Sequence, residues 1–165
     1  MKAFKLLLLL TPLLAKNVSA QDVLLNILSQ NSGTVSKKET VFLEITVCNT
    51  SSTISVPAFK LRPQISFPSA LISIPDSGHV LPAGWTITSN SGSVVFLSNG
   101  TDQLPANGCR TILIAMHGKA IGGPSTISGN LTFSNGLAPG SAPGPATPGD
   151  NPADNASTST IRVIK

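Results

Sequence analysis

The chain is poor in the side chains that carry chemistry. Only 11% of its 165 residues are charged, and it has no tyrosine, one tryptophan, two histidines and two cysteines. An enzyme site needs titratable groups gathered in one place, and this sequence offers few. It has no G-x-S-x-G nucleophile motif and no zinc-finger spacing of cysteine and histidine. We therefore expect no enzyme, no catalytic residues, no cofactor and no bound metal.

Two groupings come closest to a site. Asp76, Ser77 and His79 share one short stretch, but neighbours in sequence rarely satisfy the geometry of a catalytic triad. Residues 150–155 (DNPADN) offer side-chain oxygens for calcium, but the loop pattern D-x-[DN]-x-[DN]-G is missing. We interpret both groupings as polar loops.

Long apolar runs are missing after the first 20 residues. Residues 1–20 have a basic start, a short apolar run and small residues at the end, which is the pattern of a secretory signal peptide cleaved after Ala20. The segment is interrupted by Pro12 and Lys16, and its apolar run falls short of the roughly 20 residues that a membrane span needs. We expect a protein that is secreted or held at the cell surface, with no membrane span after signal cleavage.

The net charge of +4 overstates how basic the domain is. Lys2, Lys5 and Lys16 belong to the expected signal peptide, and the other basic residues are scattered apart from Lys37-Lys38. This distribution excludes the basic patch of a nucleic-acid-binding protein. We expect residues 21–165 to form a single domain with no nucleic-acid partner.

Strand patterns run through residues 21–165, and no stretch predicts an amphipathic helix. A period of two is clearest in residues 127–133 (ISGNLTF), where Ile127, Gly129, Leu131 and Phe133 share one face. Residues 111–116 are more apolar, which favours a strand in the middle of a sheet. Because only a Gly/Pro-rich turn lies between these two runs, we expect them to pair as an antiparallel hairpin.

Turn signals divide the rest of the domain into short strands. Residues 22–29 predict an edge strand, residues 41–49 a further strand, and residues 85–90 with 93–98 a hairpin. Residues 60–74 contain prolines, which lack the donor of a central ladder, so we expect edge strands or irregular chain there. Seven or eight strands in this order indicate an all-β fold, an immunoglobulin-like antiparallel β-sandwich with Greek-key connections.

The C-terminal part combines a loop with a last strand. Residues 137–154 (LAPGSAPGPATPGDNPAD) are dense in Pro, Gly and Ala, which favours a long exposed loop within the domain. Shortening this loop within residues 138–149 should cost little, because the entropy of loop closure varies slowly with length. Residues 157–164 predict a strand with Ile161 and Val163 facing the core.

Cys48 and Cys109 could pair in an exported protein. The apolar residues of the strand at 41–48 occupy the odd positions, so Cys48 faces away from the core. A disulfide between the two sheets is therefore disfavoured. A bridge on the outer face or at a strand end stays open, as do two free thiols.

Trp85 is the one candidate for a ligand contact. It could stack on a sugar, but the turn before it favours a place over the core. A carbohydrate-binding face usually exposes several aromatic residues, and most of the five phenylalanines after residue 20 lie in apolar strand patterns. After residue 20, four asparagines head formal glycosylation sequons, which matter only in a host that glycosylates them: Asn49, Asn99, Asn130 and Asn155.

The order of these segments resembles the bacterial conserved-repeat domain, a family of exported immunoglobulin-like modules of unknown function. The likeness rests on residues 40–49 (TVFLEITVCN), 81–85 (LPAGW), the loop 104–108 leading into the strand 110–116, and 151–163 (NPADNASTSTIRV). The proline-rich residues 60–80 and the long loop at 137–150 depart from the family's pattern. The resemblance implies a surface or secreted module of the kind found in stalks and adhesins.

We therefore predict a non-catalytic exported module with a structural or adhesive role at the surface. Its partner would be a protein or glycan that the sequence does not identify. A carbohydrate- or peptide-binding module is the alternative, supported by Trp85 and the long loop.

Overall fold

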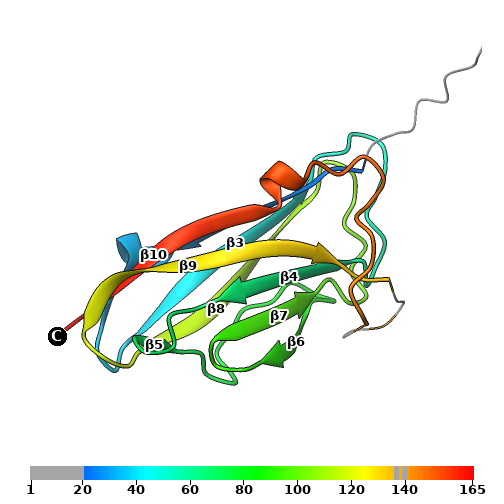
Figure 1. The fold of residues 1–165 in the computed structure, drawn as a ribbon. Helices are drawn as coiled ribbons and strands as arrows, with labels where there is room; N and C mark the ends of the chain where they lie inside the picture. Colours follow the sequence, from blue (N-terminus) through cyan, green and yellow to red (C-terminus); the bar gives the residue numbers. More distant parts are fainter. Residues whose placement is uncertain (1–20, 136–137, 139–140) are drawn as a thin grey trace, which may run out of the picture.

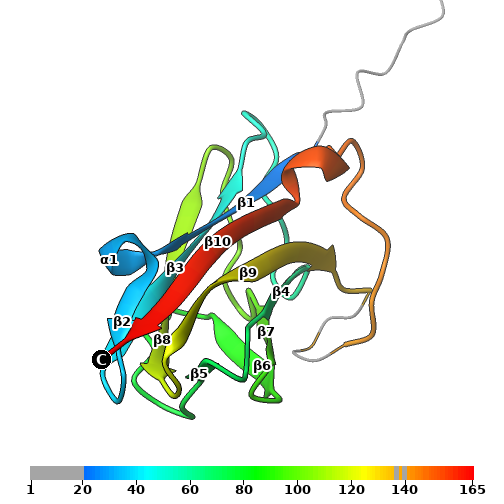
Figure 2. The ribbon, with the colours of Figure 1, turned by 60° about the vertical axis from the view of Figure 1, so that its left-hand side comes forward.

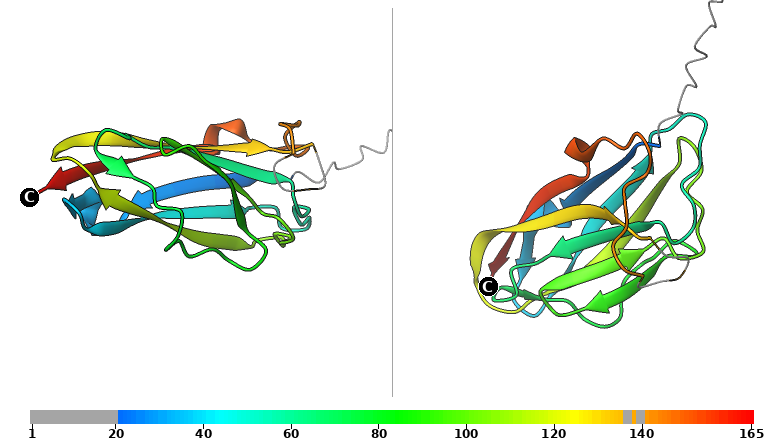
Figure 3. Two further views of the ribbon diagram at one scale, coloured as in Figure 1. Left: turned by 90° about the horizontal axis from the view of Figure 1, so that it is seen from below. Right: turned by 45° about the vertical axis from the view of Figure 1, so that its right-hand side comes forward.

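The computed structural model describes residues 21–135, 138 and 141–165. The expected signal peptide at 1–20 lies outside these residues, as do residues 137, 139 and 140 of the long loop. The described residues fold into two β-sheets packed face to face, which is clearest when the molecule is seen from below (Figure 1; Figure 3, left). The predicted all-β sandwich is confirmed.

The described residues form ten strands rather than seven or eight, because several pieces of two to six residues also pair. The four-stranded sheet has the order β1 (Val23–Ser29), β3 (Thr40–Asn49), β8 (Cys109–Gly118) and β5 (Ile72–Ser73). The six-stranded sheet has the order β2 (Thr34–Ser36), β10 (Ala156–Ile164), β9 (Gly122–Phe133), β4 (Leu61–Ser66), β7 (Val94–Ser98) and β6 (Thr86–Asn90). Its strands are antiparallel except for the pair β2–β10. Two single turns, α1 (Gln30–Gly33) and η1 (Pro152–Asp154), complete the described elements.

The core is built by the period of two along each strand. In β3 the odd-numbered residues are buried and the even-numbered ones face outward, as the sequence predicted. The inner faces of β8 and β9 show the same alternation over most of their length. Burial of such aliphatic side chains supplies the main driving force for folding. The fully buried side chains at the centre include Leu43, Ile45, Ile65, Ile112, Ile114, Ile127 and Ile161.

Gly129 stands on the inner face of β9 among these aliphatic residues. A Cβ atom at this position would lie 3.0 Å from Leu25 Cδ2, 3.1 Å from Ile27 Cγ2 and 3.2 Å from Ile65 Cδ1. The two sheets therefore approach closely here, and a larger residue would force them apart.

The predicted hairpin between residues 111–116 and 127–133 is wrong. β8 pairs with β3 and β5, whereas β9 pairs with β10 and β4 in the other sheet. The chain changes sheets in the short connection between the two strands (Figure 1). Both strands have a buried face, and these faces meet across the core instead of lying side by side. The period of two identifies the buried face of a strand but not the strand beside it.

The expectation of edge or irregular chain at residues 60–74 is wrong for β4. This strand lies inside the six-stranded sheet between β9 and β7, although it contains Pro63. Its ladder with β7 begins at Gln64, directly after the proline. The interior position is therefore compatible with Pro63, because that residue needs no partner in β7.

Three other predictions about strands are confirmed. β1 is the edge of the four-stranded sheet, and β6 and β7 form the expected hairpin. β10 pairs with β9 along most of its length, with Ile161 0% and Val163 1% exposed. The last strand is thus an integral part of the core.

The inner face of β10 carries serines where it passes β1, and the two strands run side by side although they belong to different sheets (Figure 2). The hydroxyl of Ser157 accepts a hydrogen bond from the backbone N–H of Ile27 at 3.1 Å. The hydroxyl of Ser159 accepts one from the backbone N–H of Ser29 at 2.9 Å. These hydroxyls satisfy donors on the free edge of β1, so this side of the sandwich is closed.

We expect the double substitution Ser157→Ala and Ser159→Ala to destabilise the protein. Each change leaves a backbone donor of β1 without its partner, at about 1 kcal/mol each. Denaturant unfolding measures the loss, and Thr158→Ala, an exposed position on the same strand, is the matched control. Equal stability of the double variant and the control would show that water replaces the serines without loss.

The long loop does more than connect two strands. Thr147 Oγ1 donates to the carbonyl of Gln21 at 2.7 Å, and the backbone N–H of Gln21 donates to the carbonyl of Pro148 at 2.9 Å. The ammonium group of Lys60 donates to the carbonyl of Pro145 at 2.7 Å. Residues 142–144 also bond to residues 133–135, so the expectation that shortening residues 138–149 costs little applies only to cuts that spare the contacts at 142–148.

Candidate functional site

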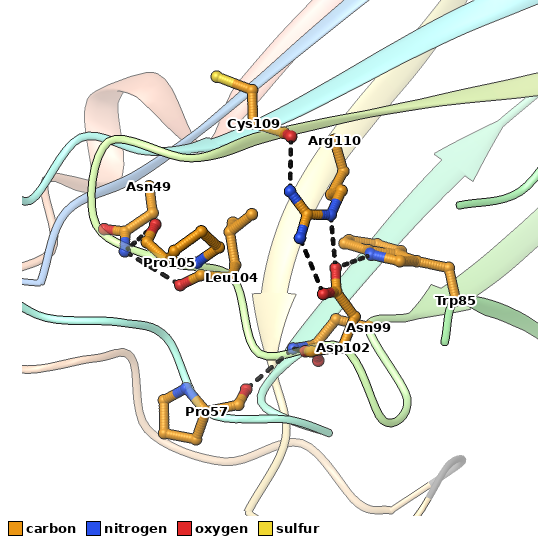
Figure 4. Close-up of polar contacts among 9 residues, drawn as sticks. All are labelled: Asn49, Pro57, Trp85, Asn99, Asp102, Leu104, Pro105, Cys109 and Arg110. Atoms are coloured by element: carbon orange, nitrogen blue, oxygen red, sulfur yellow. Dashed lines mark hydrogen bonds and ion pairs between the residues drawn. The ribbon is translucent and has the colours of Figure 1, made fainter. Parts of the chain in front are cut away.

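A polar cluster lies at the end of the sandwich where the loop between β7 and β8 passes (Figure 4). Asp102 accepts hydrogen bonds from Trp85 Nε1 at 2.8 Å, from Arg110 Nε at 2.8 Å and from Arg110 Nη2 at 3.0 Å. The third guanidinium nitrogen of Arg110 donates to the carbonyl of Cys109 at 3.0 Å. Both oxygens of the Asp102 carboxylate are thus engaged, and the cluster holds the loop against β8.

Trp85 is only 4% exposed, so its ring cannot serve as a platform for a sugar. It belongs to the core, and its one polar atom is bonded to Asp102. The sequence placed the residue correctly over the core and gave no sign of its carboxylate partner, which lies 17 positions away.

Two of the sequon asparagines hold loops at the same end (Figure 4). Asn99 is fully buried; its side chain accepts from Leu61 N at 2.9 Å and donates to the carbonyls of Pro57 and Asp102 at 2.9 and 2.8 Å. Asn49 is 1% exposed and bonds to the neighbouring loops in a similar way. These amides replace backbone partners where the chain leaves regular structure.

The four sequons differ in what their asparagines do. Asn49, Asn99 and Asn155 are buried, whereas Asn130 is exposed on the outer face of β9. A glycan on a buried asparagine would displace the amide from its bonds. Of the sequon asparagines in the part of the chain that the structure describes, Asn130 is therefore the one that is open to a glycan.

We expect Asn99→Ala to destabilise the protein by about 3 kcal/mol, since three buried backbone groups lose their partner. Asn130→Ala is the matched control, because it removes the same side chain from an exposed sequon and should change little. Denaturant midpoints of the two variants test the difference. Similar midpoints would mean that Asn99 is not structural.

Both histidines are engaged in structural contacts. His79 Nε2 lies 2.9 Å from the carbonyl of Pro75, and its Nδ1 accepts from the backbone N–H of Ala115 at 3.1 Å. His117 Nδ1 lies 2.8 Å from the hydroxyl of Thr40. His79 thereby attaches its loop to β8, and neither ring lies with Asp76 and Ser77 in the arrangement of a triad.

The acidic residues near η1 hold the loop to β1. Asp150 accepts from Val23 N at 3.3 Å and from Asn155 Nδ2 at 2.7 Å. Burial raises the pKa of the Asp150 carboxyl above its ordinary value, and the charges of Asp22 and Asp154 raise it further against these hydrogen bonds. The contribution of Asp150 to stability therefore falls as pH rises from that ordinary value through the raised one. Among the described residues, no three His, Cys, Asp or Glu side chains gather so as to hold a metal ion.

The two cysteines are joined. Cys48 and Cys109 are direct neighbours in the β3–β8 ladder, with Cα atoms 4.0 Å apart, and they form a disulfide. Both lie on the outer face of the four-stranded sheet, so of the alternatives left open by the sequence the structure has the outer-face bridge.

A cleft of about 480 Å³ lies beneath the long loop, between that loop and residues 57–60. Lys60 is the titratable residue of its described lining, and its ammonium group donates to the carbonyls of Ser134 and Pro145. The described lining thus offers walls for a small apolar group and, apart from Lys60, no acid or base. The other lining residues are Gln21, Pro57, Ala58, Asn135, Thr147 and Pro148.

The outer face of the four-stranded sheet carries a row of side chains across its full width. Leu28 of β1 lies opposite Glu44 of β3, Glu44 lies opposite Leu113 of β8, and Val80 bridges to Leu113 at the far edge. Leu28 is 58% exposed and Val80 55%. We call these four residues, with Phe42 diagonal to Leu28, the apolar row.

The outer face of the six-stranded sheet is polar. Asn130, Gln64 and Phe96 lie in register across β9, β4 and β7, and the Arg62 guanidinium lies 4.7 Å from the centre of the Phe96 ring. The sequence placed most phenylalanines after residue 20 in apolar strand patterns, and three of them, Phe42, Phe59 and Phe96, are half-buried outside the core cluster. The inward positions of Val95 and Leu97 were the signal that Phe96 faces out.

Comparison with known proteins identifies the fold. The structure is similar to a cohesin module from a Clostridium perfringens family 33 glycoside hydrolase, with TM-score 0.55, 6% identity and coverage of 88% of this chain and 97% of that one. It is also similar to the seventh ScaB type I cohesin of Pseudobacteroides cellulosolvens, with TM-score 0.50, 13% identity and coverage of 86% and 92%. The fold is immunoglobulin-like. An uncharacterised immunoglobulin-like protein from Nocardia farcinica matches at TM-score 0.49 and 14% identity, over 83% of this chain and 98% of that one.

No family model and no curated protein matches the chain. At such low identities the structural likeness establishes an immunoglobulin-like sandwich and nothing about partners. No helix among the described residues is both long enough and apolar enough to cross a membrane.

Proposed function

We propose that the chain is a non-catalytic exported module with a structural or adhesive role at the cell surface. The observation that carries the proposal is the use of its reactive side chains. His79, His117 and Asp102 are all bound into contacts that hold loops or strands together. A catalytic group needs a free lone pair or proton directed at a substrate. Both ring nitrogens of His79 and both carboxylate oxygens of Asp102 are directed at the protein, and Nδ1 of His117 is directed at Thr40.

Four further features support the proposal. Residues 1–20 have the pattern of a signal peptide, and a disulfide such as Cys48–Cys109 persists in oxidising compartments. The same fold serves as a module of a glycoside hydrolase in Clostridium perfringens. A sandwich with a polar outer face on its six-stranded sheet suits a spacer or a docking unit.

The test begins with the full-length gene expressed in a bacterial host. We expect to find the protein in the cell envelope or the medium. Its first residue should be Gln21, and N-terminal sequencing of the purified chain tests this. This material should hydrolyse no ester, peptide or glycoside substrate above the buffer rate. Turnover that disappears in His79→Gln or His117→Gln would overturn the non-catalytic assignment, and retention in the cytoplasm would overturn export.

A glycan-binding role is the second candidate, supported by the outer face of the six-stranded sheet. The side chains of Asn130 and Gln64 have no hydrogen-bond partner among the described residues, and the half-buried Phe96 ring lies beside Gln64 in the same row. Planar amides bind sugar hydroxyls, and an aromatic ring stacks on the C–H face of a sugar.

A glycan array tests this second role. Binding that is lost in Phe96→Ala and Gln64→Ala would support it. Phe42→Ala, a half-buried phenylalanine on the opposite outer face, is the matched control. An array without hits, or hits that survive Phe96→Ala, would remove the candidate.

A further inference from the structure

The apolar row combines exposed apolar side chains with an unpaired carboxylate, a combination that the surface of a protein without partners normally avoids. Leu28 and Val80 are more than half exposed, and with Leu113 and Phe42 they place four apolar side chains on one outer face. Exposed apolar side chains gathered on one face mark interaction sites in soluble proteins. The backbone beneath is rigid, because each member stands on a paired strand or on the bridge from Val80 to Leu113.

The middle of the row carries a negative charge without a counter-charge. Glu44 stands between Leu28 and Leu113, and neither a hydrogen bond nor an ion pair reaches its carboxylate among the described residues. The single ion pair among the described residues is Arg110–Asp102, which lies in the polar cluster by the β7–β8 loop. When a partner covers the row, Glu44 loses water and needs a cation in exchange.

This charge selects among the occupants of the face. A second copy related by a twofold axis would place Glu44 against its own image, because such an interface applies the same patch to itself. An anionic membrane would be repelled as well. A polypeptide that presents a lysine or arginine between aliphatic residues satisfies both the apolar side chains and the carboxylate.

We propose that the apolar row is a docking surface for such a basic-apolar segment of a partner protein, with Glu44 pairing its cation. The inference rests on the proposed function and names the partner's chemistry. Leu28 receives an aliphatic side chain on one side of the cation and Leu113 with Val80 on the other, while Phe42 stands next to Glu44 along β3. The row lies on the sheet opposite the polar face of Asn130, Gln64 and Phe96, so the two surfaces are independent.

The experiment uses the chain secreted from its full-length gene and immobilised with its disulfide intact. A random displayed peptide library is selected on it, with counter-selection on Leu28→Asp/Glu44→Gln. We expect the enriched peptides to contain a lysine or arginine flanked by aliphatic residues. Their affinity should fall about tenfold or more in Glu44→Gln, which keeps the side-chain shape and removes the charge.

Two matched controls separate the row from general effects. Glu39→Gln removes an exposed carboxylate elsewhere, and Ile121→Asp alters an apolar residue that is 55% exposed at the β8–β9 turn. Neither should change peptide affinity. In the exchange variant Glu44→Arg, peptides with glutamate in place of their cation should bind and the original peptides should not.

Several outcomes would overturn the docking surface. These are a selection without enrichment, peptides that are acidic, or peptides that bind wild type and Glu44→Gln equally. A concentration-dependent dimer in sedimentation that disappears in Leu28→Asp would instead assign the row to self-association. None of these results bears on export or on the absence of turnover, so failure of this inference is distinct from failure of the proposed function.

Discussion

Removing residues 155–165 should leave a protein that no longer unfolds cooperatively. The deletion takes away β10, which pairs with β9 on one side and with β2 on the other. Burial of Ile161 and Val163 alone is worth roughly 3–6 kcal/mol, comparable with the net stability of a whole domain. The loss of β10 also uncovers the edges of β9 and β2, and such edges promote aggregation.

Circular dichroism during heating and light scattering measure this result. The matched control removes only Lys165, and a second control, Ile164→Ser, changes a residue of β10 that is 42% exposed. Both should melt close to the full chain. A truncated protein that melts like the full chain would contradict the place of β10 in the core.

The sequence predicted the inner faces well because they depend on a local rule. Alternation in residues 127–133 and the spacing of Ile161 and Val163 at every second position both place the correct side chains inward. The partner of each strand depends on contacts across the whole chain, which no local rule contains. The error with β8 and β9 arose there, since two strands adjacent in sequence were assumed to be adjacent in one sheet.

For the candidate surfaces too, the sequence predicts which face a side chain takes but not which side chains of other strands lie beside it. Alternation in residues 94–97 shows that Phe96 faces out, and the inward alternation of residues 23, 25 and 27 in β1 shows that Leu28 does. Only the register between strands brings Leu28, Glu44 and Leu113 into one row, and the sequence of a single strand does not determine its register. The bond from Trp85 to Asp102 has no sequence signal, because it joins two loops.

The largest effect of a small change should come from the disulfide. The bond joins Cys48 to Cys109 across 61 positions, and the chain-entropy model gives about 4 kcal/mol for a loop of this length. The folded state already holds the two residues opposite each other in the β3–β8 ladder, so the stabilisation comes from limiting the unfolded chain. A loss of this size is a large part of the roughly 5–15 kcal/mol of a typical domain.

We therefore expect the double variant Cys48→Ser/Cys109→Ser to unfold at a clearly lower denaturant concentration than the oxidised wild type. Reduced wild type should match the double variant, and adding reductant to the double variant should change nothing. Cys109 is exposed, so reductant reaches the bond without unfolding. The same chain made in a reducing cytoplasm should show the lower stability, which links the bond to the expected export. Equal midpoints for the oxidised and reduced protein would contradict both the stabilising role of the bond and that link.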